Sequence, residues 1–148
     1  NIYGYAPLDE CEMDALAKKY LPILDPRLIK GVMKDCQVVA FIIGIPDMSA
    51  GIKQARGRLF PFGFIHILKA KKKTRQLDLL LGAIKKEYRG MGLDALMGMA
   101  MISSAQKAGF EIIDTHHEME ANVKVRAEME RMGGVVYKVF RVYQKPLV

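Results

Sequence analysis

The chain has 148 residues, 51% of them hydrophobic, and a formal net charge of +7. This length and this apolar content predict one globular domain, residues 1–148, and exclude a disordered chain. The charge favours an anionic partner, and nucleotide phosphates, nucleic acid, acidic lipid or acidic protein would all satisfy it. No apolar run is long enough to cross a bilayer, so we expect a soluble cytoplasmic protein without a membrane partner.

The two cysteines, Cys11 and Cys36, are too few and too far apart for a disulfide framework or a zinc site, so we expect free thiols. The chain begins at Asn1, and its regular patterns start almost at once. We therefore expect the C-terminal part of a longer protein, with a preceding domain or a second copy of the chain as a partner.

Three elements are predicted in the first part of the chain. Apolar residues recur at helical spacing from Asp9 to Leu21, and Asp9 is placed to favour the start of this helix. The β-rich runs Leu28 to Met33 and Val38 to Ile45 are separated by the polar tetrapeptide Lys34 to Gln37. This arrangement predicts an antiparallel hairpin.

Residues 47–75 form the least regular block, and we expect an irregular insertion. Ser49 is placed to cap a short helix that ends at Gly57. The apolar segment Phe60 to Ile65 is expected to pack over the sheet or, alternatively, to form a surface for a partner or an acceptor. The basic run Lys69 to Arg75 is expected to be a solvated flank, or else to reach a coenzyme phosphate or an acidic acceptor.

The second half of the chain predicts a βαβ unit followed by one helix and one strand. The run Leu77 to Ile84 is typical of a buried strand, Leu93 to Ala108 of a helix, and Phe110 to Thr115 of a second, parallel strand. Asn122 to Met132 predicts a helix, and the alternation in Val135 to Lys145 predicts a last strand. The side of the first helix that we expect to be buried comprises Leu93, Leu96, Met97, Ala100, Ser104 and Ala108.

The segment between the first strand and the first helix of this unit is charged and rich in glycine, from Lys85 to Gly92. A glycine-rich turn that enters a helix presents unpaired backbone N–H groups and the positive end of the helix dipole. Such a turn is suited to bind a phosphate group, and we expect Asp94, in the first helical turn, to point away from it. The alternative is that Gly90 and Gly92 only make the turn.

Residues Gly90 to Ala95 also match the dinucleotide fingerprint G-x-G-x-x-G/A, and Asp114 ends the next strand where a ribose-binding acid would lie. In that fingerprint the first glycine follows the strand almost directly, whereas here the charged stretch Lys85 to Arg89 intervenes. The chain also lacks the further β-α repeats of a dinucleotide fold. This alternative is therefore disfavoured.

The whole segment resembles the coenzyme A pyrophosphate loop of the GNAT superfamily of N-acetyltransferases, whose pattern is Gln or Arg, two variable residues, Gly, any residue, then Gly or Ala. Arg89, Gly90 and Gly92 match this loop, and Glu87 departs from its first position. A second motif agrees, because the helix from Asn122 to Gly133 has the spacing at which GNAT proteins carry a coenzyme-contacting Asn and a terminal Gly. The resemblance covers residues 28–145 and is to an uncharacterised bacterial type.

The resemblance implies an α/β (α+β) fold: a mixed, mostly antiparallel sheet with a central parallel βαβ unit and helices on both faces. It implies acetyl-CoA as cosubstrate and no metal. The N–H groups from Tyr88 to Leu93 would bind the pyrophosphate, and the backbone of Leu80 to Ile84 would pair with pantetheine. The residues expected to contact the coenzyme are Leu81, Gly82, Ala83, Ile84, Tyr88, Arg89, Gly90, Met91, Gly92, Leu93 and Asn122.

Acetyl transfer to an amine needs a base, a contact for the oxyanion and a proton for the departing thiolate. The resemblance places the acid at Met129, whose thioether cannot donate a proton, so Tyr137 and Tyr143 become the candidates, with packing on the predicted strand as the alternative role of each. Asp78 is the sharpest candidate base, since a carboxylate inside an apolar strand is costly unless it faces a polar cleft; a solvent-facing strand end is the alternative. Glu118 could act as a base through a water, or be an exposed loop residue.

We therefore predict an N-acetyltransferase that transfers an acetyl group from acetyl-CoA to an amine whose identity cannot be read from the sequence. The alternative is a non-catalytic coenzyme A-binding or interaction domain with the same fold, which Met129 favours. Nucleic-acid binding is not expected, because the basic run Lys69 to Arg75 lacks the interleaved aromatic residues of a single-strand platform.

Overall fold

The computed structural model describes residues 9–21, 24–115 and 117–146. The chain divides into two compact units, Asn1–His116 and His117–Val148, which are described separately. The elements of the first unit are α1 (Glu10–Tyr20), η2 (Pro26–Leu28), β1 (Ile29–Lys34), β2 (Gln37–Pro46), α2 (Ser49–Ala55), α3 (Gly63–Lys73), β3 (Gln76–Ile84), η3 (Lys86–Tyr88), α4 (Leu93–Lys107) and β4 (Ile112–Asp114).

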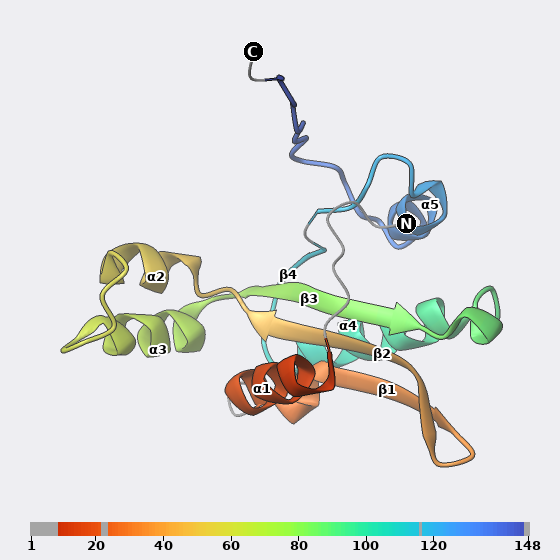
Figure 1. The fold of residues 1–148 in the computed structure, drawn as a ribbon, viewed down its shortest axis with the longest axis horizontal. Coiled ribbons are helices and arrows are strands. Elements are labelled where there is room, and N and C mark those ends of the chain that lie inside the picture. The colour runs from red at the N-terminus through yellow and green to blue at the C-terminus, as the bar shows by residue number, and fades with distance from the viewer. Residues whose placement is uncertain (1–8, 22–23, 116, 147–148) are drawn as a thin grey trace. The chain divides into compact units, whose positions relative to one another are not determined.

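A four-stranded mixed sheet in the order β1-β2-β3-β4 organises the first unit (Figure 1). β1 pairs with β2 and β2 with β3 in antiparallel fashion, whereas β3 and β4 are parallel and are connected through α4. The predicted mixed sheet with a βαβ unit is confirmed. The β1–β2 turn is tighter than the expected four-residue loop, because Asp35 and Cys36 have φ values of 49° and 60° and close it as a two-residue turn.

The predicted first helix is confirmed as α1, and its start shows why. The side chain of Asp9 accepts a hydrogen bond from the N–H of Glu12 at 2.8 Å, and the side chain of Glu12 accepts one from the N–H of Asp9 at 3.0 Å. This reciprocal capping box satisfies two donors that the helix itself leaves unpaired.

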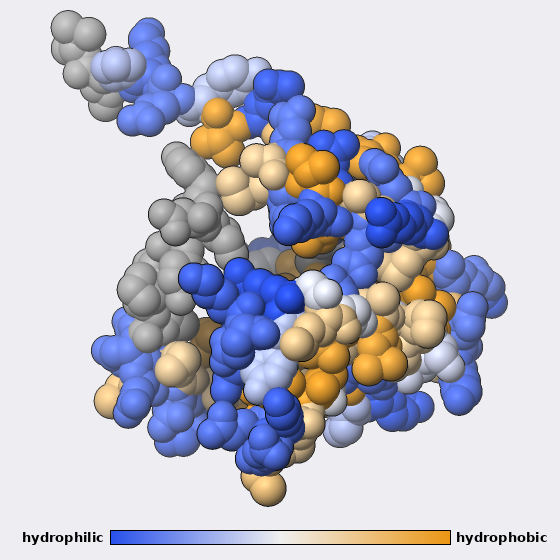
Figure 2. All heavy atoms as spheres, turned by 90° about the vertical axis from the view of Figure 1, so that its right-hand side faces the viewer, coloured by the Kyte–Doolittle hydropathy of each residue, from blue (hydrophilic) through white to orange (hydrophobic). Residues whose placement is uncertain are grey.

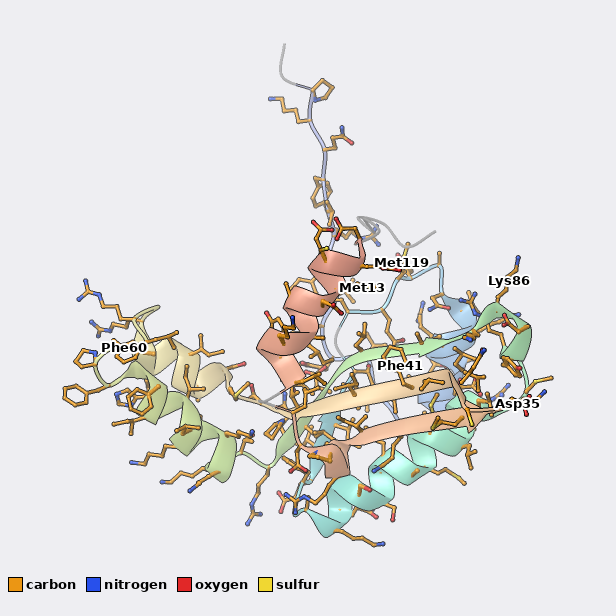
Figure 3. All side chains as sticks on the ribbon, turned by 60° about the horizontal axis from the view of Figure 1, so that its bottom comes forward. Met13, Asp35, Phe41, Phe60, Lys86 and Met119 are labelled. Carbon is orange, nitrogen blue, oxygen red and sulfur yellow. The ribbon has the colours of Figure 1, made fainter. Side chains whose placement is uncertain are left out.

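The core lies between the sheet and α4. Leu28, Leu77, Met101 and Ala105 are buried there, and Ile42, Leu79, Phe110 and Ile113 pack around them. The predicted buried side of α4 is largely wrong: its buried residues are Met97, Met101 and Ala105, while Leu96 is 56% exposed. Nearly every position of α4 is apolar or small, so its composition allowed several faces, and contact with the sheet selected one. Helix α1 lies over the opposite face (Figures 1 and 3).

The block predicted to be irregular is instead mostly helical. Helices α2 and α3 pack against each other as an arm, residues 47–75, that leaves the sheet between β2 and β3 (Figure 1). The Asp47 carboxylate accepts a hydrogen bond from the N–H of Ser49 at 2.8 Å, so Asp47 and not Ser49 supplies the side-chain acceptor at the start of α2. The expectation that Phe60 to Ile65 packs over the sheet is also wrong, because all of these residues except Gly63 are exposed.

The second unit contains α5 (Val123–Arg131), which begins after Asn122 and ends before Gly133, whose φ is 87°. This confirms the predicted helix. The predicted last strand from Val135 to Lys145 is wrong, since the described residues 132–146 have no regular secondary structure. An alternating pattern becomes a strand only where another strand pairs with it, and within this structure none pairs with these residues.

Candidate functional site

The loop between β3 and α4 makes a turn with two glycines in the left-handed region directly before a helix start. Gly90 and Gly92 both have a φ of 76°, in the left-handed region that other residues rarely adopt. A Cβ built on either glycine would find no atom of the described chain within 4 Å, so the space beside both is open. Helix α4 starts directly after Gly92, and no side chain caps it across the turn.

Some backbone N–H groups of this loop donate hydrogen bonds within the loop, and others have no acceptor in the described part of the chain. The N–H groups of Tyr88 and Arg89 donate to the carbonyls of Lys85 and Lys86, at 2.9 and 3.4 Å, within the 3-10 turn. Those of Gly90, Met91 and Gly92 have no acceptor among the residues that the structure describes. The donor set for an anion therefore begins at Gly90, later than the expected start at Tyr88.

Charged side chains lie on both sides of this loop. The Nε–H of Arg89 donates to the carbonyl of Ile84 at 3.1 Å, which fixes the arginine against the end of β3. The Lys34 ammonium lies 5.3 Å from the centre of the Tyr88 ring. Asp94 accepts a hydrogen bond from the N–H of Ala95 at 3.0 Å, so its carboxylate is held in the first turn of α4.

Figure 2 looks onto this end of the sheet and shows apolar side chains at the surface among hydrophilic ones. The exposed apolar residues here include Met91 of the loop, Leu96 and Met99 of α4, and Met33 and Val38 beside the hairpin turn. The loop is therefore accessible, and an adenine ring or another apolar ligand group would find apolar contacts beside the phosphate donors.

Strand β3 has one free edge leading to the loop. β4 pairs only with Gln76, Leu77 and Asp78, while β2 pairs along the strand as far as Ile84. The N–H of Lys85 donates to the carbonyl of Val39, and hydrogen-bonded pairs alternate along an antiparallel ladder, so the backbone groups of Gly82 and Ile84 point to the edge that β4 leaves open. An extended ligand can pair with them as an added strand would.

Asp78 lies where β3 and β4 separate. It is 8% exposed and is the buried charged residue of the described core, and its Oδ1 accepts a hydrogen bond from Nε2 of Gln76 at 2.8 Å. The alternative expectation, that Asp78 faces solvent at a strand end, does not agree with this burial. Asp78 is in register with Asp114 of β4, and both side chains are on the sheet face opposite Leu77 and α4.

Two solved aminoglycoside N-acetyltransferases and a possible acetyltransferase have folds similar to this chain. AAC(6')-Iy in complex with CoA superposes with a TM-score of 0.58 over 93% of this chain and 88% of its own, at 11% identity. The chain has the GNAT fold. A possible acetyltransferase from Clostridium difficile 630 gives 0.56 over 97% and 80%, at 18% identity, and meta-AAC0020 from a soil metagenome gives 0.58 over 99% and 80%, at 9% identity.

Two curated proteins resemble this GNAT-fold chain in sequence. The bacterial ceramide synthase of Caulobacter vibrioides is 29% identical over 153 residues, and protein YghO of Escherichia coli K12 is 23% identical over 151 residues. In both cases the alignment covers 98% of this chain but only 39% of the relative. The chain thus spans about two fifths of the length of these relatives. No family model matches it.

The residues that the sequence predicts for the site fall into two groups. Asp78, the residues 81–84 and the loop 88–93 belong to the first unit and follow one another along β3 and into α4. Glu118, Asn122 and Tyr137 belong to the second unit. There Asn122 precedes α5 without a side-chain cap, Glu118 is half-buried, and Tyr137 is exposed with the Lys138 ammonium 5.0 Å from its ring centre.

Asp114 lies in register with Asp78 and is not among the residues that the sequence predicts for the site. Its place at the end of the second parallel strand indicates only a ribose contact in the disfavoured dinucleotide alternative. The spacing in the sequence could have indicated that the two residues are neighbours. β3 and β4 are parallel and begin in register, and Asp78 and Asp114 are the third residues of β3 and β4. No group of three or more His, Cys, Asp or Glu side chains in the described part of the chain could hold a metal ion.

A hollow in the surface of the first unit lies away from the loop between β3 and α4. It has a volume of about 250 Å³ and is lined by Arg27, Lys30, Ser104, Lys107 and Ala108, at the C-terminal end of α4. The loop lies at the other end of this fifteen-residue helix, about 22 Å away. Phosphate binding at the helix start therefore does not involve this hollow.

Proposed function

We propose that this chain binds an acyl-coenzyme A thioester and transfers its acyl group to an amine. The observation that carries the proposal is the free edge of β3, from Leu79 to Ile84, which runs directly into a loop of available N–H donors at the start of α4. A ligand that joins an extended amide-containing arm to a pyrophosphate is complementary to this sequence of groups.

In this proposal, the N–H groups of Gly90, Met91 and Gly92 and the start of α4 bind the pyrophosphate. The backbone groups of Gly82 and Ile84 pair with the amides of the pantetheine arm. Asp78 is six residues before Ile84, about 20 Å along an extended strand, so the arm would carry its thioester toward the point where β3 and β4 separate. Arg89 adds positive charge at the phosphate end.

The chemistry in this proposal begins with Asp78 as the base that takes a proton from the ammonium form of the acceptor. The resulting amine attacks the thioester carbonyl, and a free backbone N–H of β3 stabilises the oxyanion. Collapse of the tetrahedral intermediate breaks the carbon–sulfur bond and releases the thiolate, and the nitrogen loses its second proton to water to give the neutral amide. For the second unit the sequence supplies candidate roles only: the GNAT resemblance makes Asn122 a coenzyme contact, Tyr137 is a candidate acid because Met129 cannot donate a proton, and Glu118 is a candidate base through a water.

The similar proteins support two acyl and acceptor classes. The acetyltransferases among the solved structures favour acetyl-CoA and a small polyamine-like acceptor. The relative named ceramide synthase favours a longer acyl chain and a long-chain amino alcohol, because a ceramide is an amide of these two components. We propose an amine acceptor in either case, since both reactions make an amide.

Calorimetry with coenzyme A, acetyl-CoA and palmitoyl-CoA tests the binding step, and thiol release with a panel of aminoglycosides, polyamines and sphingoid bases tests the transfer. We expect binding of coenzyme A itself, because the phosphate and pantetheine contacts do not depend on the acyl group. The absence of heat with all three ligands at millimolar concentration would overturn the proposal.

A non-catalytic coenzyme A-binding domain is the second candidate, and Met129 favours it. In the GNAT resemblance this position of α5 carries the acid, and a thioether cannot donate a proton. Binding of coenzyme A without thioester consumption across the amine panel would support this second candidate, and turnover with any acceptor would exclude it.

A further inference from the structure

The arm formed by α2 and α3 exposes an unusual set of apolar side chains. Phe60 is 84% and Phe62 66% exposed at the turn between the two helices, and Phe60 lies at the outer end of the arm in Figure 3. The other large apolar residues that are exposed on the arm are Ile52, Leu59, Phe64, Ile65 and Leu68. None of the described helices is long and apolar enough to cross a membrane.

These side chains point outward because small residues make the contact between the two helices. Gly51, Ala55 and Gly63 are buried. A Cβ on Gly51 would lie 2.6 Å from the carbonyl oxygen of His66, and one on Gly63 would collide with the carbonyl of Arg58. The backbones approach so closely that no large side chain fits between them. On α3, Phe64 and Leu68 are four residues apart and share the outward face.

The arm also carries the excess of positive over negative charges in the chain. Between Met48 and Lys73 it contains seven of the chain's 23 Lys and Arg residues and none of its 16 Asp and Glu residues. The whole formal net charge of +7 is therefore located there, and the remainder of the chain is neutral on balance. The seven residues are Lys53, Arg56, Arg58, Lys69, Lys71, Lys72 and Lys73.

We propose that the α2–α3 arm docks on an anionic lipid bilayer, with Phe60 and Phe62 inserted at the level of the headgroups. Exposed aromatic side chains followed by a purely basic segment are complementary to such a surface, because the apolar tip enters the acyl boundary while the cations pair with phosphate groups. An acidic protein surface would match the charge but would not account for the aromatic tip.

The arrangement along the arm fits this orientation. Phe60 and Phe62 are at the tip, Arg56 and Arg58 immediately precede them, and the exposed Lys72 and Lys73 come at the end of α3 next to the sheet. The loop between β3 and α4, residues 85–92, follows the end of β3, whereas the arm joins the sheet at the start of β3, where the N–H of Asp47 donates to the carbonyl of Gln76. Docking through the arm would therefore leave the loop open to the aqueous phase. The proposal does not depend on the acyltransferase function.

Co-sedimentation of the complete protein with vesicles tests the proposal. We expect binding to phosphatidylglycerol-containing vesicles, little binding to pure phosphatidylcholine vesicles, and weaker binding as salt rises. The double variant Phe60→Ser/Phe62→Ser should reduce the partition coefficient at least tenfold, and Arg56→Gln/Arg58→Gln, which removes the two exposed charges next to the tip, should reduce it about fivefold for each charge removed. Circular dichroism and thermal unfolding confirm that both variants remain folded.

Two control variants make the test specific to the arm. Leu96→Ser/Met99→Ser removes exposed apolar residues of α4, and Lys18→Gln/Lys107→Gln removes two exposed charges elsewhere. Both should bind vesicles like the unchanged protein. Absence of binding to anionic vesicles at low salt would overturn the proposal, as would unchanged binding of the Phe60→Ser/Phe62→Ser variant or equal losses in the controls. If binding weakened with salt but was the same for the unchanged protein and the Phe60→Ser/Phe62→Ser variant, the basic residues alone would be responsible, and an acidic macromolecular partner would be indicated instead.

Discussion

The two halves of β3 have the same kind of sequence and different surroundings. In the first half, Leu77 is 0% exposed, and the strand is paired on one side with β2 and on the other with β4. In the second half, Leu81 is 56% exposed, and only β2 pairs with the strand. One strand thus serves as a core element at its start and as a ligand-facing edge at its end.

The difference follows from the length of β4 and not from the residues of β3. β4 has three residues, so it satisfies the backbone of β3 only from Gln76 to Asp78. Beyond that point the open edge exposes backbone donors and acceptors that a bound ligand can satisfy. Asp78 marks the boundary between the halves.

The largest effect is expected from Asp78→Asn at that boundary. Removing the proposed base should lower the turnover rate about a thousandfold, while coenzyme A binding stays within about twofold, because the pyrophosphate and pantetheine contacts are unchanged. Rates with the best acceptor and calorimetry measure the two effects. Asp114→Asn is the matched variant, and an equal loss of turnover there would contradict the assignment of the base to Asp78.

A Leu→Ala change in each half compares their packing. Leu77→Ala leaves a cavity against Leu28 and Met101 and should lower the free energy of unfolding by about 3 kcal/mol. Leu81→Ala on the exposed half should cost less than about 1 kcal/mol. Urea unfolding measures both, and similar losses at the two positions would show that the second half is also covered.

Gly92→Val tests the loop that continues the open half. A valine at a φ of 76° is strained, and its side chain projects into the space proposed for the phosphate, so coenzyme A affinity should fall at least about a hundredfold. Gly109→Val is the control, since Gly109 has a φ of 86° with equally open surroundings at the other end of α4. If both variants lost affinity equally, backbone strain and not the phosphate site would be responsible.

Hydrogen exchange measured by NMR compares neighbouring amides within the open half. The N–H groups of Leu81 and Ala83 point to β2 and should exchange slowly with or without ligand, whereas those of Gly82 and Ile84 should exchange rapidly in the free protein. Coenzyme A should slow Gly82 and Ile84 about tenfold or more. Unchanged exchange at these two amides would contradict pairing with pantetheine.

The smallest effect is expected at Asp25, at the start of the 3-10 turn that carries the core residue Leu28. Its carboxylate accepts hydrogen bonds from the Arg27 guanidinium at 2.7 Å and from the Arg27 N–H at 3.0 Å, and the side-chain bond holds the pKa of Asp25 below its usual value of 3.8. A lowered pKa stabilises the folded state above pH 3.8, and this contribution disappears as the pH falls through the lowered value. Asp25→Asn should therefore cost less than about 1 kcal/mol at pH 7 and nothing in strong acid. A constant difference between the two proteins across this pH range would contradict the assignment.

Local signals were sufficient for much of the fold and for the loop. The capping box at Asp9, the β1–β2 hairpin and the glycines at 90 and 92 depend on neighbours within a few residues, so their conformations could be predicted from the chain. The element order from β1 to α5 followed from the same kind of reasoning. The strand predicted at Val135 to Lys145 failed because alternation records the propensity of a segment and not the presence of a partner.

The sequence by itself determined where a glycine-rich turn enters a helix, because backbone conformation at glycine and the start of a helix are local properties. Only the tertiary structure decided which part of β3 is open, that Asp78 is buried beside Asp114, and that the aromatic residues of the arm face outward. Each of these depends on segments distant in sequence: the short β4, its register with β3, and the close packing of Gly51 and Gly63 between α2 and α3.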